Sequence, residues 1–578
     1  MRISPLPILM ACLAISLPAQ DTADAFFGLD KIWDIDLVVQ REDWTQMFPG
    51  PRSARTTNQM RFFGEFPYRT GDVTIGSFTA KGIGVRMKGN TSFGATAGTL
   101  KRSLKLDFNR HDPKGNFLGL TKLNLHCNAL DGTQIKEAVS YQIYRDAGIV
   151  AVRTCFARVF LTIPGEVERT YIGLYTVVEQ LDGRFMKREL GGGLIMKPEG
   201  KTLAYCGEEW NDEYTRLYTP KSTVTDDLAR PLIATAKLYK DDDDEAFAKG
   251  LEAVTDVDQF LRYTAVTTVI VNGDSPVTFD DNYYLVVPNK PKKVMWLPWD
   301  LNWSMGGFNQ AMRAPAEDLA IMQPSAKKAF TRPLAVPRFA KRYREIITEL
   351  MAGPCSARSM LTHIRVAHAT VKDALAQEAT RDKAVTAASE ALGGPRGGRM
   401  SMFRGRDGDD LAALQAFATA RAQSVNDQLA GRSKGRPPRS RSGGSRRETV
   451  PGFQVRDVLG GTGALDPAKA PFSKEDLDVA IAAAFKRTDA DGSAAVNRDE
   501  LTIVLRRFLK ASRGSDRIGE TDLASFRSRR ALSLLDGDDD GAVTADEWKA
   551  GIEKLLPKWD KDKNGTWSRK ELNVVSLE

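Results

Sequence analysis

The chain has 578 residues, 42% of them hydrophobic and 27% charged, and a formal net charge of +8. These values are ordinary for a soluble globular protein, and the length allows two to four domains. The five cysteines and four histidines show no zinc-ligand spacing. A zinc site and a His-based nucleophilic triad are therefore not expected.

The first 20 residues have the pattern of a secretory signal peptide. Arg2 precedes an apolar run over Leu6–Leu17, and Pro18–Gln20 is a candidate cleavage zone. A lipoprotein signal ending at Cys12 is the alternative. The apolar run is too short to span a bilayer, so we expect the protein to be secreted, periplasmic or held at the cell surface.

In an oxidising compartment the remaining cysteines could form one or two disulfides, in a pairing that the sequence leaves open. They are Cys127, Cys155, Cys206 and Cys355.

One stretch of the chain is predicted to be a β-hairpin with polar groups at both ends. Apolar runs at Tyr283–Val287 and Val294–Leu297 flank the turn sequence Pro-Asn-Lys-Pro-Lys-Lys. Because a hairpin brings its ends together, Asp274, Asn282 and Asp300 are expected to converge. Two carboxylates and an amide can hold Mg²⁺ against a phosphate chain.

The part of the chain before this hairpin is predicted to be rich in strands. Leu100–Phe108 alternates apolar and polar residues, which predicts a strand with one buried face. Lys101 and Lys105 share its other face. The further predicted strands are Ile35–Val39, Val73–Phe78, Ala157–Ile163, Tyr171–Val178 and Leu194–Lys197.

Helices are predicted on both sides of the hairpin. Thr133 is the expected cap of a helix over 134–147, and Asp256 is the expected cap of a helix over 257–271. The segments 205–255 and 313–430 are also predicted to be mainly helical.

A basic linker is predicted over 431–470. Pro, Gly, Ser and Arg dominate its first half, and residues 430–447 contain no acid, a composition typical of a flexible chain. Nucleic-acid binding is not expected of an exported protein. An anionic component of the cell surface is a candidate partner for this basic tract.

Three twelve-residue loops near the carboxyl terminus have the ligand spacing of EF-hand calcium sites. The predicted Ca²⁺ ligands are Asp489, Asp491, Ser493, Ala495, Asn497 and Glu500; Asp536, Asp538, Asp540, Ala542, Thr544 and Glu547; and Asp560, Asp562, Asn564, Thr566, Ser568 and Glu571. Ala494 replaces the turn glycine of the first loop, so weaker binding is expected there. A degenerate fourth repeat near 511–522 would fill the gap before the second loop.

Five short motifs, in chain order, resemble the spore coat protein H (CotH) family over about residues 30–430. The resemblance implies a secreted or surface-associated atypical protein kinase with a reduced kinase-like fold. Such an enzyme would use ATP with Mg²⁺ or Mn²⁺ to phosphorylate hydroxyl groups of a protein substrate. The motifs are Lys88–Ser92, Lys101–Lys105, Gly173–Tyr175 with Glu179 and Asp182, Asn282–Leu285 and Leu297–Asp300.

The resemblance also implies roles for individual residues. Lys101 or Lys105 would hold the nucleotide phosphates, and either Glu137 or Glu179 would pair with that lysine. Asp274 would orient or deprotonate the acceptor hydroxyl. The residues expected around the metal are Asp300, Asn282 and Asn302.

The chain departs from the family pattern near the expected metal. The family usually has Trp-Asp-x-Asp where this chain has Trp-Asp-Leu-Asn, so Asn302 can coordinate through its carbonyl oxygen but brings no charge. The spacing from Asp274 to Asn282 is longer than in the family. Asp281 is therefore an alternative to Asp274 as the catalytic aspartate.

These patterns predict an α+β chain: a CotH-like kinase domain over 24–430, the linker, and an all-α EF-hand domain over 471–578. The predicted function is a secreted atypical protein kinase with a Ca²⁺-binding module. The alternative is a non-catalytic surface or matrix scaffold that docks through its Ca²⁺-binding repeats.

Overall fold

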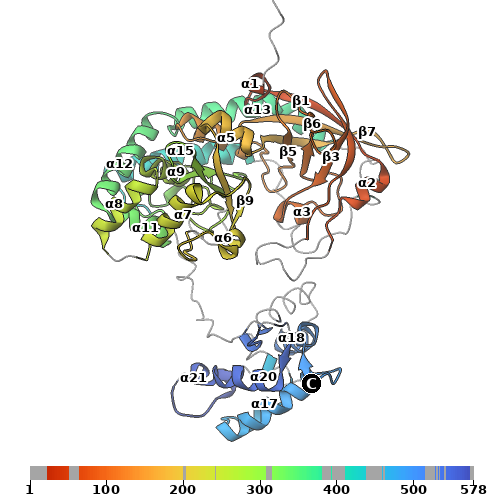
Figure 1. Cartoon of the computed structure of the whole chain (residues 1–578), viewed down its shortest axis with the longest axis vertical. Coiled ribbons are helices and arrows are strands. Elements are labelled where there is room, and N and C mark those ends of the chain that lie inside the picture. The colour runs from red at the N-terminus through yellow and green to blue at the C-terminus, as the bar shows by residue number, and fades with distance from the viewer. Residues whose placement is uncertain are drawn as a thin grey trace, which may run out of the picture. The chain divides into compact units, whose positions relative to one another are not determined.

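The computed structural model describes residues 23–50, 64–199, 203–240, 243–307, 316–380, 392, 410–437, 458–513 and 528–572, the last two ranges with a few positions omitted. The chain divides into two compact units, Met1–Arg439 and Ser440–Glu578 (Figure 1). The predicted signal peptide lies outside the described residues. Within them, no helix combines the length and apolar character needed to cross a membrane.

Seven strands of the first unit close into a barrel in the order β1-β2-β3-β4-β5-β7-β6. Neighbouring strands are antiparallel except β1 and β6, which run parallel. Alternate side chains point inward, so the register partners Val85, Leu106 and Leu123 are all fully buried. The strands are β1 (Ile32–Val38), β2 (Arg69–Ile75), β3 (Phe78–Met87), β4 (Leu104–Asp107), β5 (Lys122–His126), β6 (Thr154–Ile163) and β7 (Val167–Glu179).

Two strand predictions need correction. A single strand over Val73–Phe78 is wrong, because Gly76 turns the chain at a φ of +57° and separates β2 from β3. The strand predicted over Leu100–Phe108 begins only at Leu104. Before Leu104 the chain makes side-chain contacts instead: the Arg102 guanidinium packs on two phenylalanine rings, at 4.6 and 5.5 Å from their centroids.

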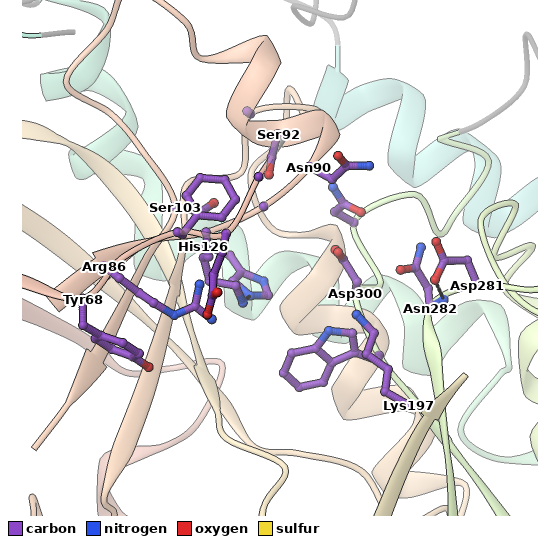
Figure 2. A pocket seen from close by; sticks show the side chains of 18 of the residues that line it. Tyr68, Arg86, Asn90, Ser92, Ser103, His126, Lys197, Asp281, Asn282 and Asp300 are labelled. Atoms are coloured by element: carbon purple, nitrogen blue, oxygen red, sulfur yellow. Dashed lines mark hydrogen bonds between the residues drawn. The ribbon is translucent and has the colours of Figure 1, made fainter. Parts of the chain in front are cut away.

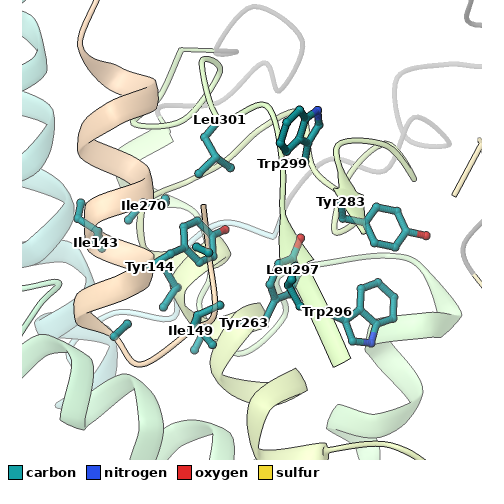
Figure 3. Packing of buried hydrophobic residues seen from close by; sticks show 14 of the residues in the cluster. Ile143, Tyr144, Ile149, Tyr263, Ile270, Tyr283, Trp296, Leu297, Trp299 and Leu301 are labelled. Atoms are coloured by element: carbon teal, nitrogen blue, oxygen red, sulfur yellow. The ribbon is translucent and has the colours of Figure 1, made fainter. Parts of the chain in front are cut away.

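A second, four-stranded sheet in the order β11-β10-β8-β9 contains the predicted hairpin, which is confirmed. Tyr283 pairs with Pro298 and Val286 with Met295. The Trp296 ring stacks on Tyr283 at 5.0 Å and is buried among the side chains that Figure 3 shows. The strands are β8 (Gly193–Pro198), β9 (Tyr218–Pro220), β10 (Tyr283–Pro288) and β11 (Met295–Pro298).

Helices make up the rest of the first unit. Asp256 caps α9 as predicted, accepting from the Gln259 backbone N–H at 3.1 Å. Asp131, and not Thr133, caps the start of α4, since it accepts from the Lys136 N–H at 2.8 Å. The helices are α1 (Ala23–Phe26), α2 (Arg41–Gln46), α3 (Thr91–Ala95), α4 (Lys136–Asp146), α5 (Gly183–Leu190), α6 (Asp212–Leu217), α7 (Asp226–Leu238), α8 (Asp244–Val254), α9 (Val257–Val269), η1 (Ala316–Asp318), α11 (Lys328–Ala335), α12 (Pro337–Ala352), α13 (Ala357–Ala379) and α15 (Asp410–Leu429).

Two long-range features tie this unit together. Helix α13 packs against both β7 and α4. At the end of the unit, the Arg436 backbone exchanges two 2.7 Å hydrogen bonds with Asp318 and Ala320, so the first residues of the predicted linker belong to the folded unit. Cys127, Cys155, Cys206 and Cys355, which the sequence offered for disulfides, form none in the described residues.

The second unit is helical with one short strand pair. Strand β12 (Ala495–Val496) pairs with β13 (Val543–Thr544), so the first and second predicted Ca²⁺ loops pair directly. The expected repeat near 511–522 lies largely outside the described residues. The helices are η3 (Pro467–Lys469), α17 (Lys474–Thr488), α18 (Arg498–Arg513), α20 (Ala545–Glu553), α21 (Leu556–Trp559) and α22 (Arg569–Leu572).

Candidate active site

A cavity of about 1120 Å³ is lined by residues of both the barrel and the second sheet (Figure 2). Arg86 and His126 come from barrel strands β3 and β5, and Lys197 comes from β8. The register partners Arg86, Lys105 and Asn124 share the outer face of the barrel. Basic side chains therefore gather on that outer face.

The ends of the β10–β11 hairpin supply the acidic and amide groups of the cavity. Asp281, Asn282, Asp300 and Asn302 all line it. Asn282 and Asp300 adopt positive φ angles of 59° and 54°, a conformation that costs free energy for residues other than glycine and clusters at functional sites. The Asp300 backbone N–H is held by the Tyr141 hydroxyl at 3.0 Å.

The structure brings the three predicted residues Asp274, Asn282 and Asp300 together. The Asn282 amide donates to the Asp274 carboxylate at 2.7 Å. Asp274 is absent from the described lining of the cavity, whereas the adjacent acid Asp281 is part of it. Asp274 therefore supports Asn282, and Asp281 faces the space that a ligand would fill.

Carboxylates in this group raise one another's pKa. Burial, with Asp281 and Asp300, raises the pKa of Asp274 to about 7. Burial and the Glu137 carboxylate raise the pKa of Asp300. A bound cation would relieve this repulsion.

The donor set also fits a hard divalent cation. Asn302 Oδ1 is buried and accepts no hydrogen bond from the described residues. It lines the cavity together with the Asp300 and Asp281 carboxylates. Carboxylate and amide oxygens are the ligands that Mg²⁺ and Mn²⁺ prefer, so these residues could hold either ion.

Lys88 is one of the lysines that the structure brings to these acids. Its ammonium donates to Asn124 Oδ1 at 3.1 Å and lies 5.4 Å from the centre of the Trp299 ring. Withdrawal from water lowers its pKa to about 7, a fall that the Asp300 charge opposes. Lys88 begins one of the five sequence motifs, but nothing in its spacing distinguished it from the other lysines.

The two lysines predicted to hold phosphates are placed differently. Lys101 is 8% exposed and is bonded to Glu378 at 2.8 Å and to Gln134 at 2.8 Å. Lys105 is half-buried, and burial together with Lys88 and Arg86 lowers its pKa to about 7. Neither lysine belongs to the described lining of the cavity.

Of the two candidate glutamates, Glu137 lines the cavity and Glu179 does not. Glu179 is 1% exposed and pairs with Arg153 at 2.6 Å and with Arg188 at 3.0 Å. Burial opposes its ionisation, but these two arginines hold its pKa below the usual value. Glu179 therefore joins β7 to its surroundings, away from the cavity.

Lys197 and His126 are cavity residues that sequence reasoning missed. Burial works to lower the pKa of Lys197, but Tyr284 and Asp281 outweigh it and raise the pKa. Lys197 is the last residue of the strand predicted over Leu194–Lys197, and His126 lies in none of the predicted strands or helices. No local pattern distinguishes either residue, because what places them is the approach of two separate sheets.

The second unit holds three further acidic clusters, one in each predicted Ca²⁺ loop. In each cluster the carboxylate oxygens lie within 4.8 Å of one another. Ala494 adopts the left-handed turn, at a φ of 65°, that the missing glycine would take without strain. The clusters are Asp489, Asp491 and Glu500; Asp536, Asp538 and Asp540; and Asp560, Asp562 and Glu571.

The remaining predicted ligands lie in turns around these carboxylates. The Ser493 N–H donates to Asp489 at 3.0 Å, and Thr544 caps α20 by accepting from the Glu547 N–H. Ala495 and Ala542 have only backbone carbonyls to offer, while Asn497, Thr566 and Ser568 carry polar side chains. These turns bring acids that are spaced along the sequence into compact clusters.

The first unit is a mixed α+β fold whose cavity sets carboxylates and an amide opposite lysines, the combination that a metal ion and a phosphate chain require. A protein-family model described as CotH kinase protein matches residues 85–425, more than half of the chain. The protein belongs to the CotH kinase family, which suggests kinase activity. No curated protein matches the chain.

Proposed function

We propose that this protein is an atypical protein kinase that transfers phosphate from ATP to hydroxyl groups of a protein substrate. The observation that carries the proposal is the cavity in which Asp281, Asp300 and Asn302 share one lining with Lys88. The family match supports the same reaction class.

Each cavity residue has a role that follows from its chemistry. The Lys88 ammonium holds phosphate oxygens. Asp300 and Asn302 offer oxygens to Mg²⁺ or Mn²⁺, which when bound would neutralise charge on the phosphates. Lys101 and Lys105 do not reach the described lining of the cavity. Their contribution is to the stability of the barrel and to the positive electrostatic potential of its outer face.

Two acids are candidates for the acceptor side of the reaction. Asp274 has a pKa of about 7, which suits a general base at neutral pH. Asp281 has the better position, because it lines the cavity. We assign Asp281 to the acceptor hydroxyl and Asp274 to the orientation of Asn282.

We further propose that the second unit binds Ca²⁺ through its three acidic loops and that the protein acts outside the cytoplasm after its signal peptide is removed. Clusters that offer only oxygen atoms, within 4.8 Å of one another, support calcium binding.

A scaffold role is the second candidate function. It is favoured by Asn302, which stands where a charged metal ligand is expected and lowers the negative charge available to a metal.

Transfer of radiolabelled phosphate from ATP, with Mg²⁺ or Mn²⁺, tests the kinase proposal. We expect labelling by the wild type, loss in Asp300→Ala and Asp281→Ala, and a smaller loss in Asp274→Ala. Asp30→Ala is the matched control, because that acid is 64% exposed and pairs with the neighbouring Lys31. No labelling by any protein would favour the scaffold role.

A further inference from the structure

Three side chains form a hydrogen-bonded chain along one wall of the cavity. The Lys88 ammonium lies 2.6 Å from His126 Nε2. His126 Nδ1 lies 2.8 and 3.0 Å from the two oxygens of Glu137. Lys88 follows β3, His126 ends β5 and Glu137 is in the first turn of α4, so the chain links three separate elements.

The chemistry of the two ends fixes the tautomer of the ring between them. In its charged form, which is the form that binds phosphate, the Lys88 ammonium can only donate, so Nε2 accepts from it. Nδ1 then carries the ring hydrogen and donates it to the Glu137 carboxylate, which can only accept. The neutral imidazole with hydrogen on Nδ1 is the form that satisfies both contacts.

Two of the three ammonium hydrogens of Lys88 are used within the protein, one by His126 and one by Asn124 Oδ1 at 3.1 Å. The third remains for a ligand. The Trp299 ring, 5.4 Å away, limits the directions that the side chain can take. Lys88 is thereby held in a single orientation beside Asp300.

We propose that His126 is a positioning residue. Its ring is fixed by the Glu137 carboxylate and in turn fixes the Lys88 ammonium in the orientation that binds the phosphate groups of ATP. The inference rests on the proposed kinase function and adds a residue to it. Its role is to orient another side chain, and His126 itself contacts no reacting atom.

A metal-ligand role for His126 is the competing explanation. One ligand atom each of His126, Glu137 and Asp300 lie within 4.8 Å of one another. However, both nitrogens of the ring already have partners, and one of those partners is a cation. A metal ion bound at His126 would have to displace Lys88 or Glu137, whereas Asp300 and Asn302 offer oxygens without such a cost.

The first experiment needs no kinase activity. Acetic anhydride modification of Lys88, followed by mass spectrometry of the full-length protein, is compared between wild type and His126→Phe, which keeps an aromatic ring but removes both nitrogens. We expect Lys88 to react about fivefold to tenfold faster in the variant, since one hydrogen bond to a charged group is lost. An unchanged rate would overturn the proposal.

A conservative variant and a matched control sharpen this result. His126→Gln carries an amide oxygen that can accept from Lys88 and an N–H that can donate to Glu137, so most of the protection should return. His363→Phe is the matched control, because His363 also has an acidic partner: its Nε2 lies 2.8 Å from the Asp146 carboxylate. This variant should leave the modification rate of Lys88 unchanged. Circular dichroism shows whether each variant is folded. If His126→Phe is unfolded, the modification rate of Lys88 in His126→Gln tests the proposal.

Kinetics and metal binding separate the positioning role from its alternatives. In His126→Phe we expect the KM for ATP to rise about tenfold with a smaller fall in kcat, because a positioning contact to phosphate is weakened. Mn²⁺ binding, followed by electron paramagnetic resonance without ATP, should stay within about twofold. Loss of Mn²⁺ binding would make His126 a metal ligand and refute the positioning role.

If the wild type transfers no phosphate, the proposed function fails. The modification and Mn²⁺ measurements would still decide whether His126 positions Lys88.

Discussion

Replacement of Asp274 by asparagine should stabilise the protein at alkaline pH. The Asp274 carboxyl has a pKa of about 7 in the folded chain, against an ordinary value of 3.8. Between these two values the folded state holds a proton that the unfolded state has lost, so stability falls as pH rises through this window. Above pH 7 the folded protein carries the full cost of an ionised carboxylate beside Asp281 and Asp300.

The size of the effect follows from the pKa gap. A gap of about three units at about 1.4 kcal/mol per unit gives an upper bound near 4 kcal/mol at pH 8. Because Asp274 keeps some exposure, screening should reduce the gain to about 2–4 kcal/mol. At pH 5 only about 1 kcal/mol should remain, since that pH is about one unit above the ordinary value.

The asparagine side chain preserves the local contact, because its oxygen can still accept from Asn282. Urea unfolding of the wild type and Asp274→Asn, at pH 5 and pH 8 without divalent ions, measures the difference. Asp30→Asn, at an exposed acid, is the control and should have no effect. Equal stability of the two proteins at pH 8, or a gain of the same size at both pH values, would refute this electrostatic argument.

Four further predictions address other parts of the chain. Lys88→Ala should raise the KM for ATP about tenfold or more in steady-state kinetics. Lys101→Ala should leave that KM unchanged but lower the free energy of unfolding by about 1–3 kcal/mol, because the Glu378 carboxylate loses its bonds to the Lys101 ammonium. Glu179→Ala should destabilise by about 2–4 kcal/mol in urea unfolding, since the buried Arg153 guanidinium loses its buried carboxylate partner and keeps only the exposed Asp24. Glu547→Gln should remove one of three Ca²⁺-binding events in calorimetry of the full-length protein, and an unchanged stoichiometry would count against that loop.

The hairpin and the cap of α9 could be predicted because their signals are local. The turn sequence between two apolar runs fixes which residues pair, and Asp256 needs only the backbone three residues ahead of it. The register then places Asn282 and Asp300 at one end of the hairpin. The α+β class follows from the same alternation of local patterns.

The choice among lysines could not be predicted, because it depends on partners distant in the sequence. Lys101 is bonded to Glu378, 277 residues further along the chain. Lys88 reaches the acids only because the barrel and the second sheet meet at the cavity. His126 becomes informative only when Lys88 and Glu137 are seen on either side of its ring.

The strand predicted over Val73–Phe78 failed for a different reason. Apolar residues continue through the turn at Gly76, so composition alone does not show where one strand ends. Backbone conformation decides it, since Gly76 takes a φ of +57° at little cost.

The parallel pairing of β1 with β6 has a consequence for the order in which the protein can fold. Ile32 lies beside Phe156 and Val38 beside Thr162, so the first strand must wait for its neighbour while the intervening chain is synthesised. Until then both edges of a growing sheet are open to pairing with other chains. A fragment that ends before β6 would keep those edges exposed, and we expect it to aggregate where the longer chain folds.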